Sequence, residues 1–399
     1  MNERATSLCS ARNGLRIIVL QPTIPEYRLP LFERLSHSLN IELRVYGSED
    51  YMTAAELKNG NRTTTFSYSK CKSKTFAGGR VVWQSGLHFG EWLRAGDVLV
   101  LCGNPRYLSN YPLILRARQL GIGVVWWGQG WSVGSRGFFS WLRQKIMKFA
   151  DVLLLYTDEE VRDYVKLGFD SDRVFATNNA IDQEQAFKLT SEWNDVRLLQ
   201  FRSENEIKDR RVLIFCGRLI KKTEVDFLVV ILPRIVQRWP KILLAVIGDG
   251  PMRADLQAQA FESGVQDHIR WLGSIYDEQK IAPWFLSSEI FVYPGAIGLS
   301  LLHSMGYGLP VLTHSDRVYH GPEFSAIRDG KNSLTFRKGD EYDFIEKLGL
   351  LMDNDAMRRD LSRSARMTVE DKYSITEMVT RFVGAIHAAS QIATSKSGA

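Results

Sequence analysis

The chain has 399 residues, of which 45% are hydrophobic and 24% charged, and its formal net charge is +6. This composition is that of an ordinary globular protein long enough for about two to three domains, and it excludes a disordered chain. No stretch reaches the roughly 20 consecutive apolar residues of a membrane helix, and the first 14 residues lack the apolar core of a signal peptide, so we expect a cytoplasmic protein.

From Leu15 onward, short apolar runs alternate with amphipathic segments. The expected strands are LRIIVLQP, IELRVYG, DVLVLCG, IGVVWWG, VLLLYT and RVFATN. Helices are expected at PLFERLSHSL, at 113–120, through Phe149 and after Thr157. Continuous apolar strands separated by helices favour a parallel, doubly wound sheet. Residues 1–185 therefore form a Rossmann-like first domain in this prediction.

Residues 186–210 are charged and lose the apolar periodicity, so we expect an interdomain connection with one helical segment. A second alternation fills 211–368 and predicts a second Rossmann-like domain. Its expected strands are VLIFCG, ILLAVIGDG, IRWLG, 289–293, the run after Pro310 and SLTF, and its expected helices are 225–236, the segment after Pro251, 281–286, 298–308 and 342–361. Residues 369–399 are expected to form a last helix with a frayed tail. The predicted fold class is α/β, with two doubly wound Rossmann-like domains facing across a cleft.

The stretch 287–314, SSEIFVYPGAIGLSLLHSMGYGLPVLTH, predicts a strand, a turn, a helix that begins near Gly298, and a return strand. In a parallel sheet the carboxyl ends of the strands form the ligand-binding edge, and a helix start there suits a phosphate group. We therefore expect a nucleotide diphosphate at the start of this helix.

Two other loops follow strands of the second half. Gly217 and Arg218 come directly after a strand, with Lys221 and Lys222 close behind, so this loop is either a phosphate-binding element or a solvated basic turn. The sequence GDGP at 248–251 is good turn and cap chemistry. Neither G-x-G-x-x-G nor G-x-x-x-x-G-K is present, which weakens a dehydrogenase or nucleotide triphosphatase assignment.

The order and spacing of FCGRL, VIGDGP, IRWLG and VYPGAIGLSLLHSMGYGLPV resemble the donor-binding half of GT-B glycosyltransferases, most closely the retaining family-four group. In the first half, QPTIPEYRLPLF, VVWQSGL, WWGQGW and ADVLLLYT look like the bacterial surface and exopolysaccharide enzymes of that group. The resemblance implies that Arg218 contacts the donor diphosphate. It also implies that the main chain at Ser274 and Ile275 meets the base, and that Gly298 and Leu299 take phosphate oxygens.

Several positions depart from the family pattern. A lysine is usual where this chain has Thr223, so Lys222 is the nearest substitute. Two glutamates are usual where this chain has Gly295 and His303; a neutral imidazole can still bond ribose hydroxyls, whereas glycine offers only backbone. Gln129 replaces a histidine near the transferred sugar, and it can hold a hydroxyl group but cannot move a proton.

Glu323 matches a family Pro-Glu position and is a second donor-side candidate, or a helix cap. On the acceptor side the candidates are Pro25 to Arg28, Trp83 with Gln84, and Asn104 to Arg106; Glu26 and Arg28 are equally well explained as helix caps. The acidic residues 170–172 and 353–355 are expected to cap helices.

The segment from Arg136 to Phe149 is basic and aromatic. Phe138, Leu142, Ile146 and Phe149 are expected to face the domain core, leaving Phe139, Trp141 and the basic residues for an anionic membrane surface or for solvent. The four cysteines, which have no metal-like spacing, fit a reducing compartment.

The predicted function is a hexosyltransferase that moves a sugar from a nucleotide-diphosphate sugar to a saccharide or lipid-linked saccharide, with retention, in polysaccharide biosynthesis. Gln129 and Arg218 are the expected catalytic residues, and Arg218, Lys222, Ser274, Ile275, Gly298, Leu299, His303 and Glu323 are the expected donor-binding residues. No cofactor, no metal and no nucleic acid are expected, and the cytoplasmic protein would lie at the inner face of the membrane. The alternatives are a nucleotide-sugar epimerase and a non-catalytic partner subunit of the same architecture.

Overall fold

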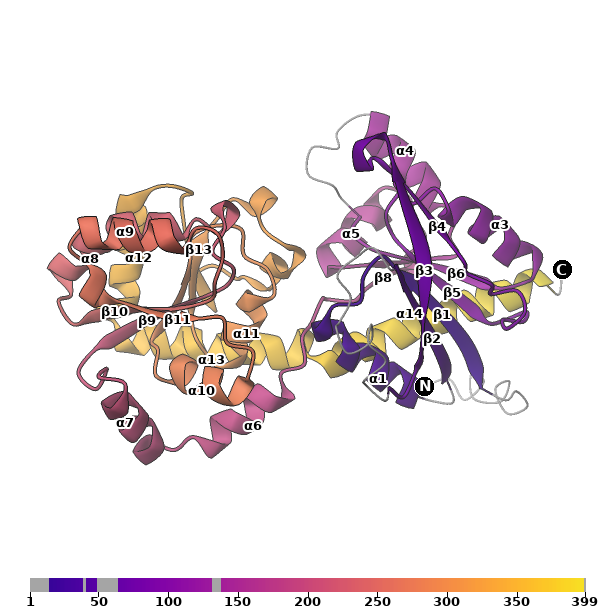
Figure 1. Cartoon of the computed structure of the whole chain (residues 1–399). Coiled ribbons are helices and arrows are strands. Elements are labelled where there is room, and N and C mark those ends of the chain that lie inside the picture. Colours follow the sequence, from indigo (N-terminus) through magenta and orange to yellow (C-terminus); the bar gives the residue numbers. More distant parts are fainter. Residues whose placement is uncertain (1–13, 39–40, 49–63, 131–137, 398–399) are drawn as a thin grey trace. The chain divides into compact units, whose positions relative to one another are not determined.

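The computed structural model describes residues 14–38, 41–48, 64–130 and 138–397. The chain forms two compact units: residues 1–179 together with 375–399, and residues 180–374 (Figure 1). Each unit is a Rossmann-like α/β domain built on a mainly parallel sheet, as the alternation of strands and helices predicts.

The sheet of the first unit has the order β4-β3-β2-β1-β5-β6-β7-β8. Its strands are β1 (Leu15–Gln21), β2 (Ile41–Ser48), β3 (Ser67–Phe76), β4 (Val81–Ser85), β5 (Val98–Cys102), β6 (Gly123–Trp127), β7 (Val152–Leu155) and β8 (Val174–Ala176). All neighbouring pairs are parallel except β3 with β4. The sequence did not reveal β3 and β4, because β3 is largely exposed and rich in polar residues and β4 is a short strand at the edge of the sheet.

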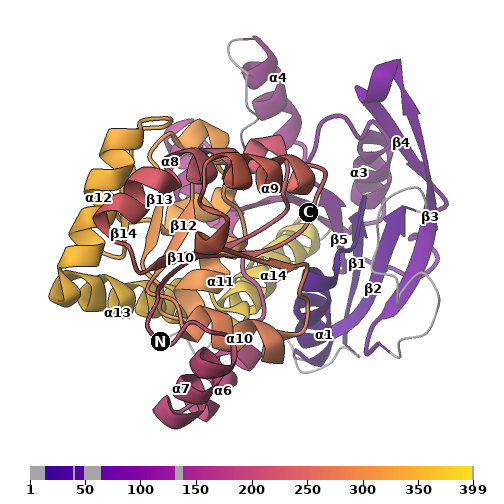
Figure 2. The same ribbon diagram turned by 60° about the vertical axis from the view of Figure 1, so that its left-hand side comes forward.

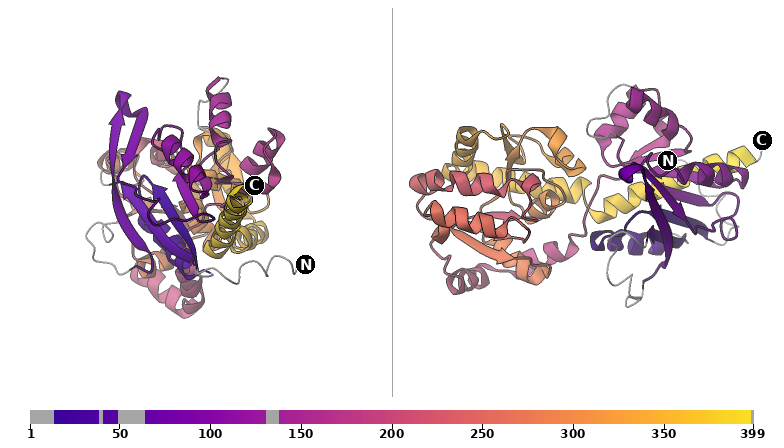
Figure 3. Two further views of the ribbon diagram at one scale, coloured as in Figure 1. Left: turned by 90° about the vertical axis from the view of Figure 1, so that its right-hand side faces the viewer. Right: turned by 45° about the horizontal axis from the view of Figure 1, so that its top comes forward.

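Helices cover both faces of this sheet, and alternate residues of β6 show which face is which. Trp126 belongs to the core under α3 (Asn110–Gln119) and α5 (Asp158–Lys166), whereas Trp127 packs edge-on against Phe32 of α1 (Leu29–His37) and Phe382 of α14 (Ile375–Ser397). Helix α14 runs along β5 to β8 (Figure 3). The first unit is therefore completed by the last helix of the chain.

The six-stranded sheet of the second unit is entirely parallel, in the order β11-β10-β9-β12-β13-β14. Its strands are β9 (Arg211–Cys216), β10 (Ile242–Ile247), β11 (Ile269–Gly273), β12 (Ile290–Tyr293), β13 (Val311–His314) and β14 (Ser333–Phe336). Helices α8, α9 and α12 cover one face, and α10, α11 and α13 cover the other (Figure 2). These helices are α8 (Val225–Arg238), α9 (Arg253–Glu262), α10 (Glu278–Leu286), α11 (Ser300–Gly306), α12 (Glu341–Asp353) and α13 (Asp355–Lys372).

Three helical segments differ from the sequence prediction. The expected connection 186–210 contains two helices, α6 (Glu184–Glu192) and α7 (Asp195–Glu204), which pack on α10 within the second unit. The expected helix 342–361 is interrupted at Asn354, whose side chain accepts the backbone N–H of Met357 and so caps α13.

The expected frayed tail is helical as far as Ser397. It is held in the first unit by the buried Ala393, and Lys396 Nζ lies 2.6 Å from Asp151 Oδ1. None of the helices in the described ranges combines the length and the apolar character needed to span a membrane.

Candidate functional site

Four loops at the carboxyl ends of the second unit's strands are joined by backbone hydrogen bonds. The loop after β9 meets the loop after β10 where Leu219 N donates to Asp249 O at 3.0 Å. Gly248 N donates to Gly273 O at the end of β11, and Ala296 N, in the loop after β12, donates to Lys222 O, both at 2.8 Å. The structure thus brings the sequence-predicted loops together at one edge, which is the ligand-binding edge of a doubly wound sheet.

Glycine is required at two of these contacts. A Cβ atom on Gly248 would lie 1.9 Å from Gly217 O, and one on Gly295 would lie 2.4 Å from Lys222 O. Gly295 stands where the resemblance implies a glutamate. The β9 loop occupies that space, so no side chain fits there.

The turn after β9 presents cations to solvent. Thr223, at the position of the family lysine, is buried and donates its hydroxyl to Ile220 O at 2.7 Å, closing the 3₁₀ turn Lys221–Thr223. The side chains of Arg218, Lys221 and Lys222 are exposed. Thr223 is therefore a structural residue of this turn, and the positive charge comes from its neighbours.

A buried carboxylate lies beside the start of α11. Glu323 is 4% exposed, and its Oε2 lies 3.9 Å from the position that a Cβ would take on Gly298. Its segment is joined to the β12 loop because Gly321 N donates to Ile297 O at 2.8 Å. Glu323 lies in the first turn of the 3₁₀ helix Pro322–Ala326, whose N-cap residue is Gly321.

His303 is held by a glutamate that the sequence did not single out. Its Nε2 lies 2.7 Å from Glu278 Oε1, which also accepts the Tyr307 hydroxyl at 2.5 Å, and its ring packs against Phe285. Burial alone would lower the pKa of His303, but the Cys216 thiol and the Glu278 carboxylate raise it to about 9.

The raised pKa favours the protonated imidazole over the neutral form expected at 303, with Glu278 as the paired carboxylate. Glu278 escaped notice because an acidic residue at the start of a helix is ordinarily explained by the helix dipole. The same pairing explains why the pKa of Glu278 is lowered although burial opposes this.

The loop after β11 carries the two residues expected at the base. Ser274 is exposed and Ile275 is partly buried against the core, and both follow Gly273, which has a φ of 72°. Their proposed contact with the base stays a prediction.

Gln129 belongs to the first unit, in the loop after β6, and its side chain is exposed. Its neighbour Gly130 donates its N–H to Glu160 Oε1 at 2.7 Å and accepts the Tyr164 hydroxyl at 2.6 Å. Helix α5 therefore fixes the backbone on which Gln129 stands. In the sequence, Thr157 and Glu160 have only the spacing of a capping box, which does not indicate the contact between Glu160 and Gly130.

Comparison with known proteins agrees with this geometry. Residues 210–354 match the family model of "Glycosyl transferases group 1". The crystal structure of Anabaena HepE in complex with UDP superposes with a TM-score of 0.66 at 12% identity, covering 97% of this chain and 100% of that one. The chain carries a glycosyl transferases group 1 domain on a GT-B fold.

Curated relatives of this GT-B chain include a phosphatidylinositol N-acetylglucosaminyltransferase subunit, gpi3, of Schizosaccharomyces pombe. It is 28% identical over 27% of this chain and 24% of its own length. The sulfoquinovosyl transferase SQD2 of Arabidopsis thaliana is 25% identical over 61% of this chain and 47% of its own. The chain thus matches less than half the length of each of these two relatives.

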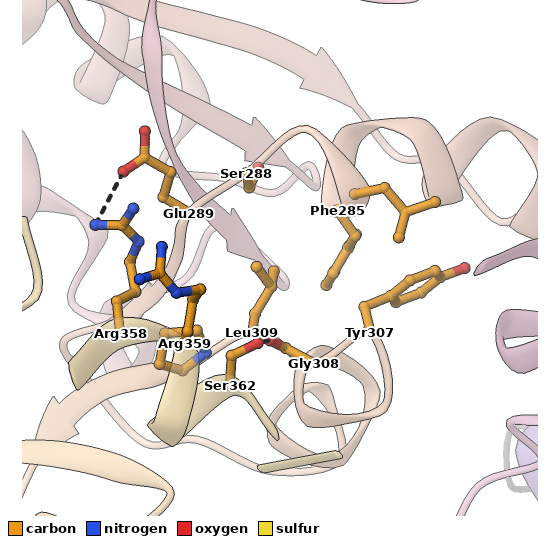
Figure 4. Close-up of a pocket in the computed structure, with 11 residues that line it drawn as sticks. Phe285, Ser288, Glu289, Tyr307, Gly308, Leu309, Arg358, Arg359 and Ser362 are labelled. Atoms are coloured by element: carbon orange, nitrogen blue, oxygen red, sulfur yellow. Dashed lines mark hydrogen bonds and ion pairs between the residues drawn. The ribbon is translucent and has the colours of Figure 1, made fainter. Parts of the chain in front are cut away.

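The second unit also has a cavity of about 260 Å³ (Figure 4). Its lining includes no residue of the loops after β9, β10, β11 and β12. Tyr307, Leu309 and Arg359 line it, and Glu289 lies 3.6 Å from Arg358 at its rim. Glu289 immediately precedes β12, so this cavity is at the amino end of the strands. It is not the candidate site.

The sequence candidates on the acceptor side separate into structural and exposed residues. Gln84 is buried and donates to Ser48 Oγ at 2.9 Å, whereas Trp83 and Arg106 are exposed. Asn104 Oδ1 accepts the N–H of Arg106 at 3.1 Å, which shapes the loop after β5. Arg28 is 7% exposed and occupies the N-cap position of α1, but its side chain makes no capping hydrogen bond.

The aromatic basic segment forms α4 (Phe138–Met147), and Arg136 lies outside the described residues, as do the side chains of Phe138, Phe139 and Leu142. Trp141 is 51% exposed, as expected. Phe149 was expected in the core but is 48% exposed, and Met147 is buried instead. The helix ends at Met147, so the helical period does not carry Phe149 to the buried face.

Proposed function

We propose that this chain transfers a hexosyl unit from a nucleotide-diphosphate sugar to a saccharide or lipid-linked saccharide, with retention, in polysaccharide biosynthesis. The observation that carries the proposal is the hydrogen-bonded set of loops after β9, β10, β11 and β12, with exposed cations on the first. The glycosyl transferases group 1 match over 210–354 and the UDP complex of HepE support a nucleotide-sugar donor. The name of gpi3 supports a lipid-linked acceptor.

The diphosphate binds to Arg218 and Lys222 and to the main chain at Gly298 and Leu299. The two side chains are exposed at the sheet edge, and arginine forms charge-assisted hydrogen bonds with phosphate oxygens. Arg218 stabilises the leaving diphosphate as charge develops on it, which is its catalytic role. The base lies against Ser274 and Ile275.

The carboxylates of the family pattern are replaced by groups from other elements. Glu323, beside Gly298, provides a carboxylate for the sugar hydroxyls in place of the side chain that Gly295 lacks. The His303–Glu278 pair replaces the ribose-binding carboxylate, and the Glu278 carboxylate accepts hydrogen bonds from the ribose hydroxyls. Gln129 holds the transferred sugar, and transfer then depends on positioning and electrostatic stabilisation without proton transfer by this side chain.

The decisive experiment incubates the pure chain with a panel of nucleotide sugars, with and without saccharide and lipid-linked acceptors. Nucleotide release that requires an acceptor supports the transferase, and the anomeric configuration of the product tests retention. Isomerised donor without acceptor indicates an epimerase. Absence of donor binding indicates a partner subunit, an alternative favoured by the lack of a carboxylate at Gly295.

We also propose peripheral binding to the inner face of the cell membrane through α4. Trp141 is exposed, and Lys145 Nζ lies 5.7 Å from its ring centroid, so an aromatic ring and a cation share one face. Flotation with liposomes, with and without anionic lipid, tests this. Failure to float with either lipid composition contradicts it.

A further inference from the structure

The first unit has a cavity of about 170 Å³ of its own. It lies where β1, β5 and β6 end, and its lining includes Gln21, Arg28, Cys102, Trp127 and Tyr156. The carboxyl ends of parallel strands are where α/β sheets bind ligands. The position of this cavity is therefore that of a binding site.

A buried arginine forms part of the wall. Arg28 is 7% exposed, and its guanidinium lies 5.1 Å from the ring centroid of Trp127 and 5.3 Å from that of Tyr27. Its side-chain hydrogen-bond partner is the Met378 sulfur at 3.7 Å, a weak acceptor. Among the described residues no carboxylate is paired with Arg28. A desolvated cation without a counter-charge is costly, whereas a bound anion would neutralise it.

The other groups of the wall carry no negative charge. Gln21 Nε2 and Trp127 Nε1 are buried donors without a hydrogen-bond partner in the described part of the chain. Burial raises the pKa of the Cys102 thiol to about 12, so it is neutral at physiological pH. The guanidinium N–H groups lie in the plane of the group, so contacts with the faces of Trp127 and Tyr27 do not occupy them. Apart from the weak bond to Met378, these donors are available to a bound anion.

We propose that this cavity binds an oxyanion, a phosphate or a carboxylate group, with Arg28 as its counter-charge. The assignment of this group to the acceptor rests on the proposed function. The group would be a phosphate of a lipid-linked saccharide or the carboxylate of an acidic sugar. Both fit the fork of donors that arginine presents. In this proposal the Arg28 side chain, which makes no capping hydrogen bond at the start of α1, binds the acceptor.

The test is calorimetric titration of the full chain with methyl phosphate, glucuronate and glucose, each without nucleotide sugar. We expect at least one of the two anions to bind and glucose not to bind, and the tighter anion identifies the source of the group. Arg28→Gln should weaken anion binding roughly 10- to 100-fold, the effect of losing a charge-assisted hydrogen bond. The matched control is Arg162→Gln, an exposed arginine on α5, which should bind as the unmodified chain does.

No binding of either anion, or equal binding by Arg28→Gln and the unmodified chain, overturns the proposal. If Arg28→Gln fails to fold by circular dichroism, Gln21→Leu replaces it: weaker binding supports the site and unchanged binding overturns it. UDP binding is measured on the same samples and should be equal in all of them. If the unmodified chain does not bind UDP, the result counts against the proposed function. If it binds UDP but neither anion, the result counts only against this site.

Discussion

At the residue scale, the candidate site differs from the sequence pattern that it resembles at Thr223 and Gly295. Thr223 closes a turn where a lysine is usual, and Gly295 makes room for that turn. The sequence identified Arg218 and the glycines because they follow strands directly. It could not identify Glu278, whose role depends on a contact with His303, 25 positions away in the chain.

Arg218→Ala should weaken UDP binding by about 1.5–3 kcal/mol, the contribution of a hydrogen bond to a charged group. Calorimetry with UDP measures this directly. Arg359→Ala is the control, because Arg359 lines the cavity at the amino end of the strands and should not affect UDP. Unchanged UDP affinity in Arg218→Ala would remove Arg218 from the site.

Gly295→Glu restores the family residue and should nevertheless destabilise the second unit by about 1–3 kcal/mol, the usual cost of overpacking. The reason is the 2.4 Å between its Cβ and Lys222 O. Urea unfolding compares it with Gly298→Ala, whose Cβ meets nothing closer than Glu323 Oε2 at 3.9 Å. A Gly295→Glu chain as stable as Gly298→Ala would show that the β9 loop can move aside.

Stability should fall as the pH rises from about 6.5 to about 9. The folded-state pKa of His303 is raised, so its contribution is complete below 6.5 and is lost as the pH passes 9. The lowered pKa of Glu278 adds stability that is lost below about 4.5. Between these two pH values, the contribution of His303 to the free energy of unfolding should fall by on the order of 2–3 kcal/mol. Unfolding of the unmodified chain and His303→Gln across this range measures it, and parallel pH profiles would refute the assignment.

At the element scale, the buried parallel strands were predicted more accurately than the ends of the helices, whereas β3 and β4 were missed. Buried parallel strands are continuous apolar runs with clear limits, whereas helix ends depend on local caps such as Asn354. The length of α14 was also missed, because its last turns are polar in sequence and are held by contacts with distant residues such as Asp151. Tertiary contacts of this kind leave no periodic signal.

Ending the chain at Ser390 should destabilise the first unit by about 2 kcal/mol or more. The truncation removes the buried Ala393 and leaves the carboxylate of Asp151, which is 3% exposed, without Lys396. Thermal unfolding is compared with a chain that ends at Ser397, which retains both contacts. Equal melting temperatures would show that the last turns of α14 contribute nothing.

At the scale of the whole molecule, the acidic residues Asp170 and Asp353 make contacts within the fold. Asp170 caps a 3₁₀ turn, and Asp353 accepts hydrogen bonds from Arg238 and Trp239. In the part of the chain that the structure describes, no three His, Cys, Asp or Glu side chains form a metal-binding group. In the proposed site, Arg218 and Lys222 carry the positive charge that faces the phosphate groups.

Because Arg218 and Lys222 supply the positive charge in the proposed site, we expect nucleotide release in the presence of donor and acceptor to be unchanged by EDTA. The measurement compares chelated protein with the same protein after Mg²⁺ or Mn²⁺ is added back, and we expect equal rates within about twofold, a difference below 0.5 kcal/mol in the barrier. Activity that disappears with EDTA and returns with either ion would contradict the metal-independent proposal.

The placement of α14 affects the order in which the protein can mature on the ribosome. The second unit is one uninterrupted segment, 180–374, so all of it is synthesised before Ile375 is added. The first unit begins earlier, yet the face of its sheet that α14 covers along β5 to β8 stays bare until the last helix is made. Domains usually fold in the order of synthesis. Here the domain that starts first is finished last, and its apolar sheet face is exposed to chaperones or to other nascent chains throughout synthesis of the second.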